Sequence, residues 1–126
     1  MDYTDDGQLP VVTDEQLEQA RTTTRPYTIV ILGVGPKFEM PGPDRGSGVA
    51  RIIWSHGKRN YALLLAGFLS IVCPVADGSG VTGVCVFDAG PEDVGRIMSA
   101  DPAVLAGVLT YEIHPTRSFP GSTLPA

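Results

Sequence analysis

The sequence predicts an α+β protein with a ferredoxin-like βαββαβ order, in which two helices cover one face of an antiparallel sheet. Three observations predict this fold class. Four apolar segments rich in β-branched residues have the length and flanking turn residues of strands. Two other segments carry apolar residues at helical spacing. The helical segments follow the first and third strands, which gives the split βαβ order of this fold.

The first strand and first long helix are separated by an irregular loop. Residues 27–35 (YTIVILGVG) form a β-branched run that ends in glycine, which is typical of a buried strand. Residues 36–46 contain too many prolines and glycines for a regular element. We expect this loop to lie at the rim of a pocket. Ser47 can cap a helix that continues to about residue 68.

The second half of the chain supplies the remaining elements. Residues 70–75 (SIVCPV) and 80–88 (GVTGVCVFD) are predicted to form a hairpin around an Asp-Gly turn. Residues 90–100 form the second helix, with a proline at its first position and acidic residues in its first turn. The last strand is expected within residues 104–115.

The chain is expected to comprise two parts. Residues 1–25 form an extension that contains a short helix, because Thr13 and Gln16 make a capping box and few apolar residues follow. Residues 26–126 form the ferredoxin-like domain. With 126 residues, of which 43% are hydrophobic, the chain has material for a single core.

Composition argues against two classes of partner. The net charge is −5 and the only basic cluster is Lys58-Arg59, so no nucleic acid and no membrane surface is expected to bind. The longest apolar run, residues 61–75, contains Gly67 and Pro74 and is too short to span a bilayer. The acidic first residues do not have the pattern of a secretory signal. We therefore expect a soluble cytoplasmic protein.

Cys73 and Cys85 are the only cysteines, and they lack metal-ligand spacing. A hairpin centred near Ser79 would place them opposite each other, where a disulfide is conceivable. Reducing conditions in the cytoplasm favour two reduced, buried thiols instead. Neither a metal nor an organic cofactor is expected.

The strands predict a homodimer. Residues 28–34, 71–75 and 84–87 are apolar at both odd and even positions, so both faces of the sheet need to be covered. The two helices can cover only one face. A second copy of the sheet is the simplest cover for the other.

One stretch of the first long helix interrupts its apolar face with polar residues. Ile53 and Leu64 share a face that packs on a core, yet His56 and Asn60 lie between them on the same face. Gly57 adds a cost of about 1 kcal/mol in a helix interior. His56 is either a core histidine with satisfied hydrogen bonds or a catalytic or ligand-binding group at a cleft.

Asp101 is the acidic partner that the pattern offers to His56. It continues the inner phase of the second helix after Ile97 and Met98, and it can also cap a short turn because a proline follows it. The two roles are compatible. A carboxylate beside His56 would orient the ring for proton transfer. His114, at the end of the last strand, is a weaker candidate.

Two segments, HGKRNYALLLAGFLSIVCPVADG and FDAGPEDVGRIMSADPAVLAGVLTYEIHP, resemble the YCII-related family of the dimeric α/β-barrel superfamily. The resemblance covers residues 27–125. It implies a ferredoxin-like fold, dimerisation through the sheets, and a His56–Asp101 pair in a pocket beside the sheet. A related branch is associated with dehydrochlorination of chlorinated hydroxyquinols. The chain departs from the family at Cys73-Pro74, where glycine-proline is usual, and in its proline-rich loop and N-terminal extension.

The leading functional hypothesis is a cofactor-independent enzyme that performs elimination or isomerisation on a small, aromatic or enolisable molecule. His56 would act as general acid and base, and Asp101 would orient it. Asn60 and Tyr61 are expected to contact the substrate, although a helix cannot turn both inward equally. The alternatives are a non-catalytic, dimeric ligand-binding or accessory module, and a purely structural role for His56.

Overall fold

The computed structural model describes residues 2–126, and its internal contacts divide the chain into two units. One unit comprises the described residues before Pro26 together with Ser118–Ala126, and the other is Pro26–Arg117. The first unit contains a 3-10 helix, η1 (Asp6–Gln8), and the expected short helix, α1 (Asp14–Arg21). Thr13 and Gln16 form the expected capping box of α1. Neither helix buries a residue, so this unit has no core of its own.

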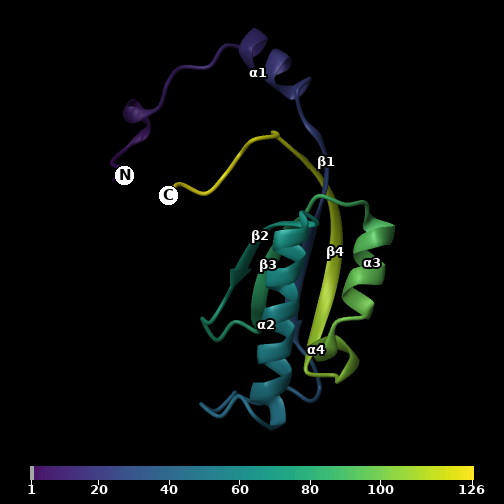
Figure 1. Ribbon diagram of the computed structural model, residues 1–126. Helices are drawn as coiled ribbons and strands as arrows, with labels where there is room; N and C mark the ends of the chain where they lie inside the picture. Colours follow the sequence, from purple (N-terminus) through teal and green to yellow (C-terminus); the bar gives the residue numbers. More distant parts are fainter. Residues whose placement is uncertain (1) are drawn as a thin grey trace. The chain divides into compact units, whose positions relative to one another are not determined.

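The second unit has the predicted α+β, ferredoxin-like fold (Figure 1). Its sheet has the strand order β2-β3-β1-β4. Both long helices, α2 and α3, lie on one face of the sheet (Figure 1). The elements, in chain order, are β1 (Arg25–Val34), α2 (Gly48–Ala66), β2 (Leu69–Pro74), β3 (Val81–Phe87), α3 (Pro91–Ser99), α4 (Pro102–Leu105) and β4 (Leu109–Ser118).

Strand β3 pairs antiparallel with β1 on one side and with β2 on the other. Cys85 lies opposite Val30 in one pairing and opposite Val72 in the other. Beyond the end of β1, the Gly35 N–H donates to the Val108 carbonyl oxygen at 2.8 Å. A side chain on Gly35 would meet the Gly107 carbonyl oxygen at 2.3 Å, so only glycine permits this close approach.

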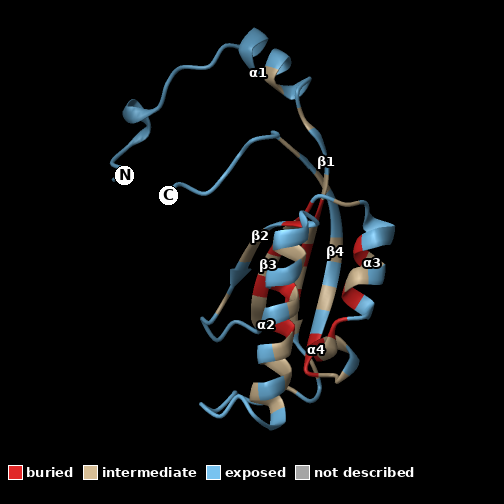
Figure 2. Cartoon of the chain, viewed as in Figure 1, coloured by how far each residue is buried: buried red, intermediate tan, exposed pale blue. Residues whose placement is uncertain are grey.

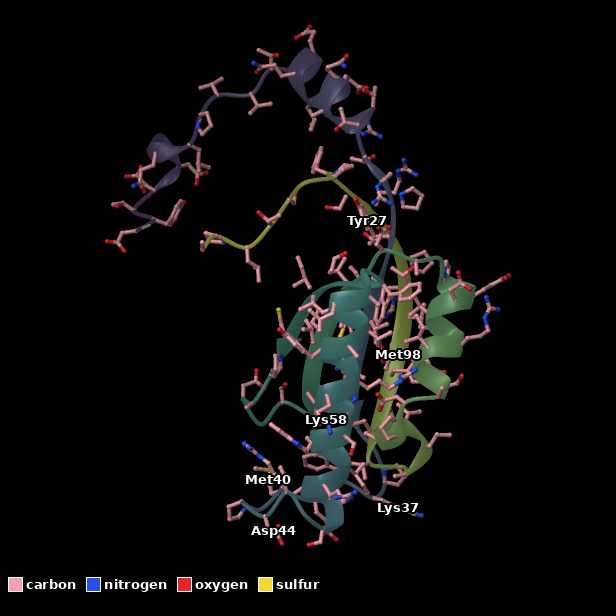
Figure 3. The ribbon with its side chains drawn as sticks, viewed as in Figure 1. Tyr27, Lys37, Met40, Asp44, Lys58 and Met98 are labelled. Carbon is pink, nitrogen blue, oxygen red and sulfur yellow. The ribbon has the colours of Figure 1, made fainter. Side chains whose placement is uncertain are left out.

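The core lies between the sheet and the helices. In β1 and β3, residues that point toward the helices alternate with residues that point away, as expected for strands. In β2, a register shift between Leu69 and Ile71 interrupts this alternation. Met98 lies on the side of α3 that faces the sheet (Figure 3), and buried residues line this inner face (Figure 2). The buried cluster comprises Val30, Leu32, Leu69, Cys85, Phe87, Val94 and Met98.

The other face of the sheet is covered by neither long helix and is apolar over three strands. The side chains of β1 to β3 that alternate with the buried ones are only partly buried, and they are Ile29, Ile31, Ile71, Val84 and Val86. On β4, the corresponding residues are Thr110, Glu112 and His114, which are exposed. The second apolar face is therefore present on β1, β2 and β3, the three strands for which it was predicted, and β4 does not extend it.

The expected facing arrangement of the cysteines is wrong. Cys73 pairs with Val84, whereas Cys85 pairs with Val72, so the two thiols lie on opposite faces of the sheet. Cys85 is buried and Cys73 is exposed, which also corrects the prediction of two buried thiols. Burial raises the pKa of Cys85 to about 11, with smaller contributions from the nearby Cys73 and Asp101. The off-by-one register excludes a direct disulfide across this pair of strands.

Two helix ends differ in detail from the sequence prediction. Ser47 occupies the cap position of α2 but makes no capping hydrogen bond, because its hydroxyl donates to Asp44 Oδ2 at 3.2 Å. Asp101 does not continue α3, which ends at Ser99; it caps the separate short helix α4. Among residues 2–126, no helix combines the length and apolar character needed to cross a bilayer.

Candidate functional site

The two residues that α2 buries are both polar. His56 and Asn60 are 9% and 6% exposed, whereas their apolar neighbours Ile53 and Leu63 are only partly buried. They lie one turn apart on the face that α2 turns toward the sheet and α4. A helix that buries an imidazole and an amide needs hydrogen-bond partners for both. The structure provides those partners.

Asp101 contacts His56 from the short helix α4. The Nδ1 atom of His56 lies 2.9 Å from Oδ1 and 3.0 Å from Oδ2 of the carboxylate. Oδ2 also accepts hydrogen bonds from the N–H groups of Ala103 and Val104, at 2.9 and 3.3 Å. Asp101 is therefore both the cap of α4 and the partner of His56, and its side chain is fully buried.

The ionised form of Asp101 is the one that the site stabilises. Burial by itself would raise the pKa of this carboxyl group, but the hydrogen bond and the charge of His56 oppose burial, and the two backbone N–H groups add to their effect. The net result is a pKa below the ordinary value of 3.8. An ionised carboxylate only accepts hydrogen bonds, so Nδ1 of His56 must carry the shared proton.

Arg59 completes the surroundings of the carboxylate. Its Nη1 atom lies 3.6 Å from Asp101 Oδ1, and its side chain is 29% exposed. Nη1 is buried and makes no hydrogen bond among the described residues, so its contact with Asp101 is one of charge. Lys58, by contrast, lies on the exposed side of α2 (Figure 3).

The second ring nitrogen of His56 meets Asn60. Asn60 Nδ2 is 3.2 Å from His56 Nε2. Because Nδ1 carries the proton, Nε2 of the neutral ring has a lone pair that accepts from the amide. If Nε2 gains a proton, rotation of the amide by half a turn presents its oxygen to the imidazolium. Asn60 can therefore pair with either protonation state.

His56 and Asn60 form part of the wall of a cavity between α2 and the sheet. The cavity has a volume of about 310 Å³. Gly57 and Tyr61 also line it, and so does Phe38 from the loop between β1 and α2, whose course Lys37, Met40 and Asp44 mark in Figure 3. The remaining lining residues are Leu32, Ile53, Val72, Pro74, Thr82 and Leu109.

The cavity is apolar apart from a few hydrogen-bonding groups. None of its described lining residues is Asp, Glu, Lys or Arg. Asp101 lies behind His56 rather than in the wall, so it reaches a ligand only through the imidazole. A small apolar pocket with a few convergent polar groups is the usual form of a small-molecule site.

The sequence-predicted residues are placed as follows. His56 and Asp101 are in hydrogen-bond contact, and Asn60 and Tyr61 both line the cavity, although Asn60 is buried and Tyr61 is 60% exposed. His114 is not part of this site; it is on β4, where Nε2 lies 3.2 Å from Glu112 Oε2.

The sequence interpretation missed three residues. Arg59 was considered only as part of the basic cluster Lys58-Arg59, although its spacing of three from His56 puts it on a neighbouring part of the same helix face. Phe38 is in an irregular loop, where no periodicity predicts which residue turns inward. Thr82 is in a strand that was interpreted as apolar, and its place in the cavity depends on strand pairing.

Comparison with models of known protein families finds no match, and comparison with curated proteins finds none either. No group of three or more His, Cys, Asp or Glu side chains in the part of the chain that the structure describes is arranged to hold a metal ion.

Proposed function

We propose that the chain is a cofactor-independent acid–base enzyme that performs elimination or isomerisation on a small, aromatic or enolisable molecule. One observation carries the proposal: His56 lines the cavity while its Nδ1 atom contacts the buried Asp101 carboxylate. Nε2 is then the ring nitrogen that can meet a ligand, once the ligand displaces the hydrogen bond from Asn60. A histidine oriented by a carboxylate behind it is the usual form of a general base.

The proposed reaction uses Nε2 twice. Nε2 first removes a proton from a carbon of the substrate, and the electron pair of that C–H bond moves into a new double bond. In an elimination the pair displaces a leaving group from the adjacent carbon, and the imidazolium then passes its proton to that group or to water; in an isomerisation the imidazolium returns the proton to a different atom of the substrate. Asp101 stabilises the positive charge of the ring between the two steps. When Nε2 carries a proton, the Asn60 amide rotates so that its oxygen accepts from Nε2.

Family membership, assembly and location belong to the same proposal. The order of the His56 and Asp101 segments supports a YCII-related protein, and the partly exposed apolar face of β1, β2 and β3 supports a homodimer with sheets face to face. A cytoplasmic location is supported by the two thiols, which are unpaired.

Proton exchange in D₂O tests the proposal even before the substrate is identified. Cyclic ketones and phenols would be incubated with the protein and followed by NMR for deuterium incorporation, and chlorinated hydroquinones for release of chloride. His56→Gln should lower the rate for an accepted compound by about 10²- to 10⁴-fold. His114→Gln is the matched control, because this second histidine is exposed and remote from the cavity, and it should leave the rate unchanged.

The second candidate function is a non-catalytic module that binds a small ligand in the same cavity. The observation that favours it is the Asn60 hydrogen bond, which occupies Nε2 of His56 in the absence of a ligand. Compounds that bind in the cavity and exchange no proton faster than in buffer would support this candidate. An exchange rate that His56→Gln leaves intact would contradict the enzymatic proposal.

A further inference from the structure

Thr82 lines the cavity from the side of the sheet, and the proposed mechanism does not use its hydroxyl group. Its Oγ1 atom is buried and has no hydrogen-bond partner among the described residues. Its backbone is satisfied, since the Thr82 carbonyl oxygen accepts from the Val75 N–H at 3.0 Å. Burial of a hydroxyl group without a partner is unfavourable, so a native structure rarely retains one without a reason.

An irregularity in strand pairing explains how Thr82 reaches the cavity. Leu32 of β1 pairs with Gly83, but the next residue, Gly33, pairs with Val81. Thr82 is thus an extra residue in β3, a β-bulge. Bulges redirect a side chain that regular alternation would point to the other face, and they occur preferentially near functional sites. Here Thr82 lines the same cavity as the inward-facing Leu32.

The cavity therefore has hydrogen-bonding groups on two walls. His56, Asn60 and Tyr61 are on the helix wall, formed by α2, and Thr82 is on the sheet wall. The other sheet residues in the lining offer only apolar side chains, and they are Leu32, Val72, Pro74 and Leu109. The Thr82 hydroxyl is covered by the protein, and rotation of this side chain about its Cα–Cβ bond would turn it toward a ligand. A ligand that fills the space between the walls can then satisfy this hydroxyl only with a polar atom of its own.

We propose that Thr82 is a specificity-determining residue that selects ring-sized ligands with two hydrogen-bonding groups, one directed to His56 and one to Thr82. The size follows from the volume of about 310 Å³, roughly twice the 150 Å³ of an apolar cavity that holds benzene. The lining has no Lys or Arg among the described residues, so phosphorylated ligands are disfavoured. This inference rests on the proposed function, because it takes His56 as the first contact.

The role of Thr82 can be tested with a double-mutant cycle in which one change is made in the protein and the other in the ligand. The probes are the three cresols and the three dihydroxybenzenes, kept under reducing conditions. Each cresol is compared with the dihydroxybenzene substituted at the same ring positions, so that the two differ only in a methyl group in place of a hydroxyl group of similar size. Dissociation constants would be measured by NMR titration. In the unmodified protein at least one dihydroxybenzene should bind tenfold or more tightly than its cresol, because an unpaired hydroxyl group in the wall penalises the methyl. Thr82→Val should abolish or reverse that preference.

Thr82→Ser is the matched control, because it keeps the hydroxyl group and should keep the preference. Thr82→Ala serves as a second variant if Thr82→Val fails to fold. A preference that survives in Thr82→Val or Thr82→Ala overturns the inference, and so does the absence of any preference in the unmodified protein. If one of these outcomes is found but the probes shift the NMR signals of the His56 ring, the inference fails and the proposed function stands. If no probe binds at about 10 mM, a concentration at which a ligand with a Kd of about 1 mM would occupy most of the sites, both fail.

Discussion

His56 and Asp101 join two helices through one carboxylate. Oδ1 is 2.9 Å from His56 Nδ1 on α2, while Oδ2 accepts from the first N–H groups of α4. The imidazole is thereby fixed in orientation and in tautomer, with its proton on Nδ1. Asp101 therefore caps α4 and also determines which ring nitrogen of His56 carries the proton. A substitution that keeps the cap but changes the group facing Nδ1 separates these two roles.

Asp101→Asn should preserve the fold and reverse the tautomer of His56. Asparagine caps helices as well as aspartate does, so its oxygen can still accept from Ala103. Its Nδ2 group then faces Nδ1, and two donors cannot pair, so the proton should move to Nε2. Long-range ¹H–¹⁵N spectra distinguish the two tautomers. A ring that keeps its proton on Nδ1 in the variant would contradict this account of the site.

The lowered pKa of Asp101 predicts a loss of stability in acid. A carboxyl group whose pKa is lower in the folded state stabilises the protein fully above its ordinary value of 3.8, and that contribution disappears as the pH falls through the folded pKa. Urea unfolding between pH 2 and 6 would measure it. The unmodified protein should lose more stability below about pH 4 than Asp101→Asn, which has no carboxyl group to protonate there. Parallel curves for the two proteins would show that this pair contributes nothing to acid lability.

The fold could be predicted because local patterns and global structure agree. β-Branched runs, the Asp-Gly turn of the hairpin and the proline at the start of α3 each indicated an element that is present. The site was predictable for a similar reason. His56 and Asn60 interrupt an apolar face at helical spacing, and such an interruption marks either a satisfied core group or a functional one.

The register in which the strands pair could not be predicted from the sequence. Symmetry about Ser79 placed Cys73 opposite Cys85, but the pairing is offset by one residue, and a shift of one residue reverses the face of every side chain. The bulge that brings Thr82 into the cavity is a second irregularity of the same kind. Neither leaves a periodic signal, because each depends on which strands meet and where.

Gly57→Ala should stabilise the protein by about 1 kcal/mol, the difference in helix propensity between the two residues. Gly57 is inside α2, and, apart from its chain neighbours and the adjacent backbone of α2, a methyl group at this position would meet no atom within 4 Å. Thermal or urea unfolding would measure the gain. Gly35→Ala is the matched control and should destabilise, because its methyl group would approach the Gly107 carbonyl oxygen to 2.3 Å. A destabilised Gly57→Ala would mean that the glycine has a conformational role in the helix.

The proposed dimer can be tested by placing an aspartate at either of two valines on adjacent strands, because the two substitutions should have different effects. Val30 is fully buried against the helices, whereas Val84 pairs with Ile31 on the apolar outer face. Val84→Asp should give a folded monomer in sedimentation velocity, because it places a charge in the interface between sheets. Val30→Asp should instead unfold the domain, since it buries an unpaired charge in the core.

The reactivity of Cys73 provides an independent measure of the same interface. This thiol is exposed in the single chain and shares the outer face with Val84, whereas Cys85 is buried on the inner face. In a dimer that covers the outer face, Cys73 should react slowly with a thiol reagent, and Val84→Asp should accelerate it. Cys85 should remain protected in both proteins, because its burial and its pKa of about 11 disfavour the thiolate. Fast reaction of Cys73 in the unmodified protein, together with a monomeric sedimentation coefficient, would show that the outer face is not where two copies meet.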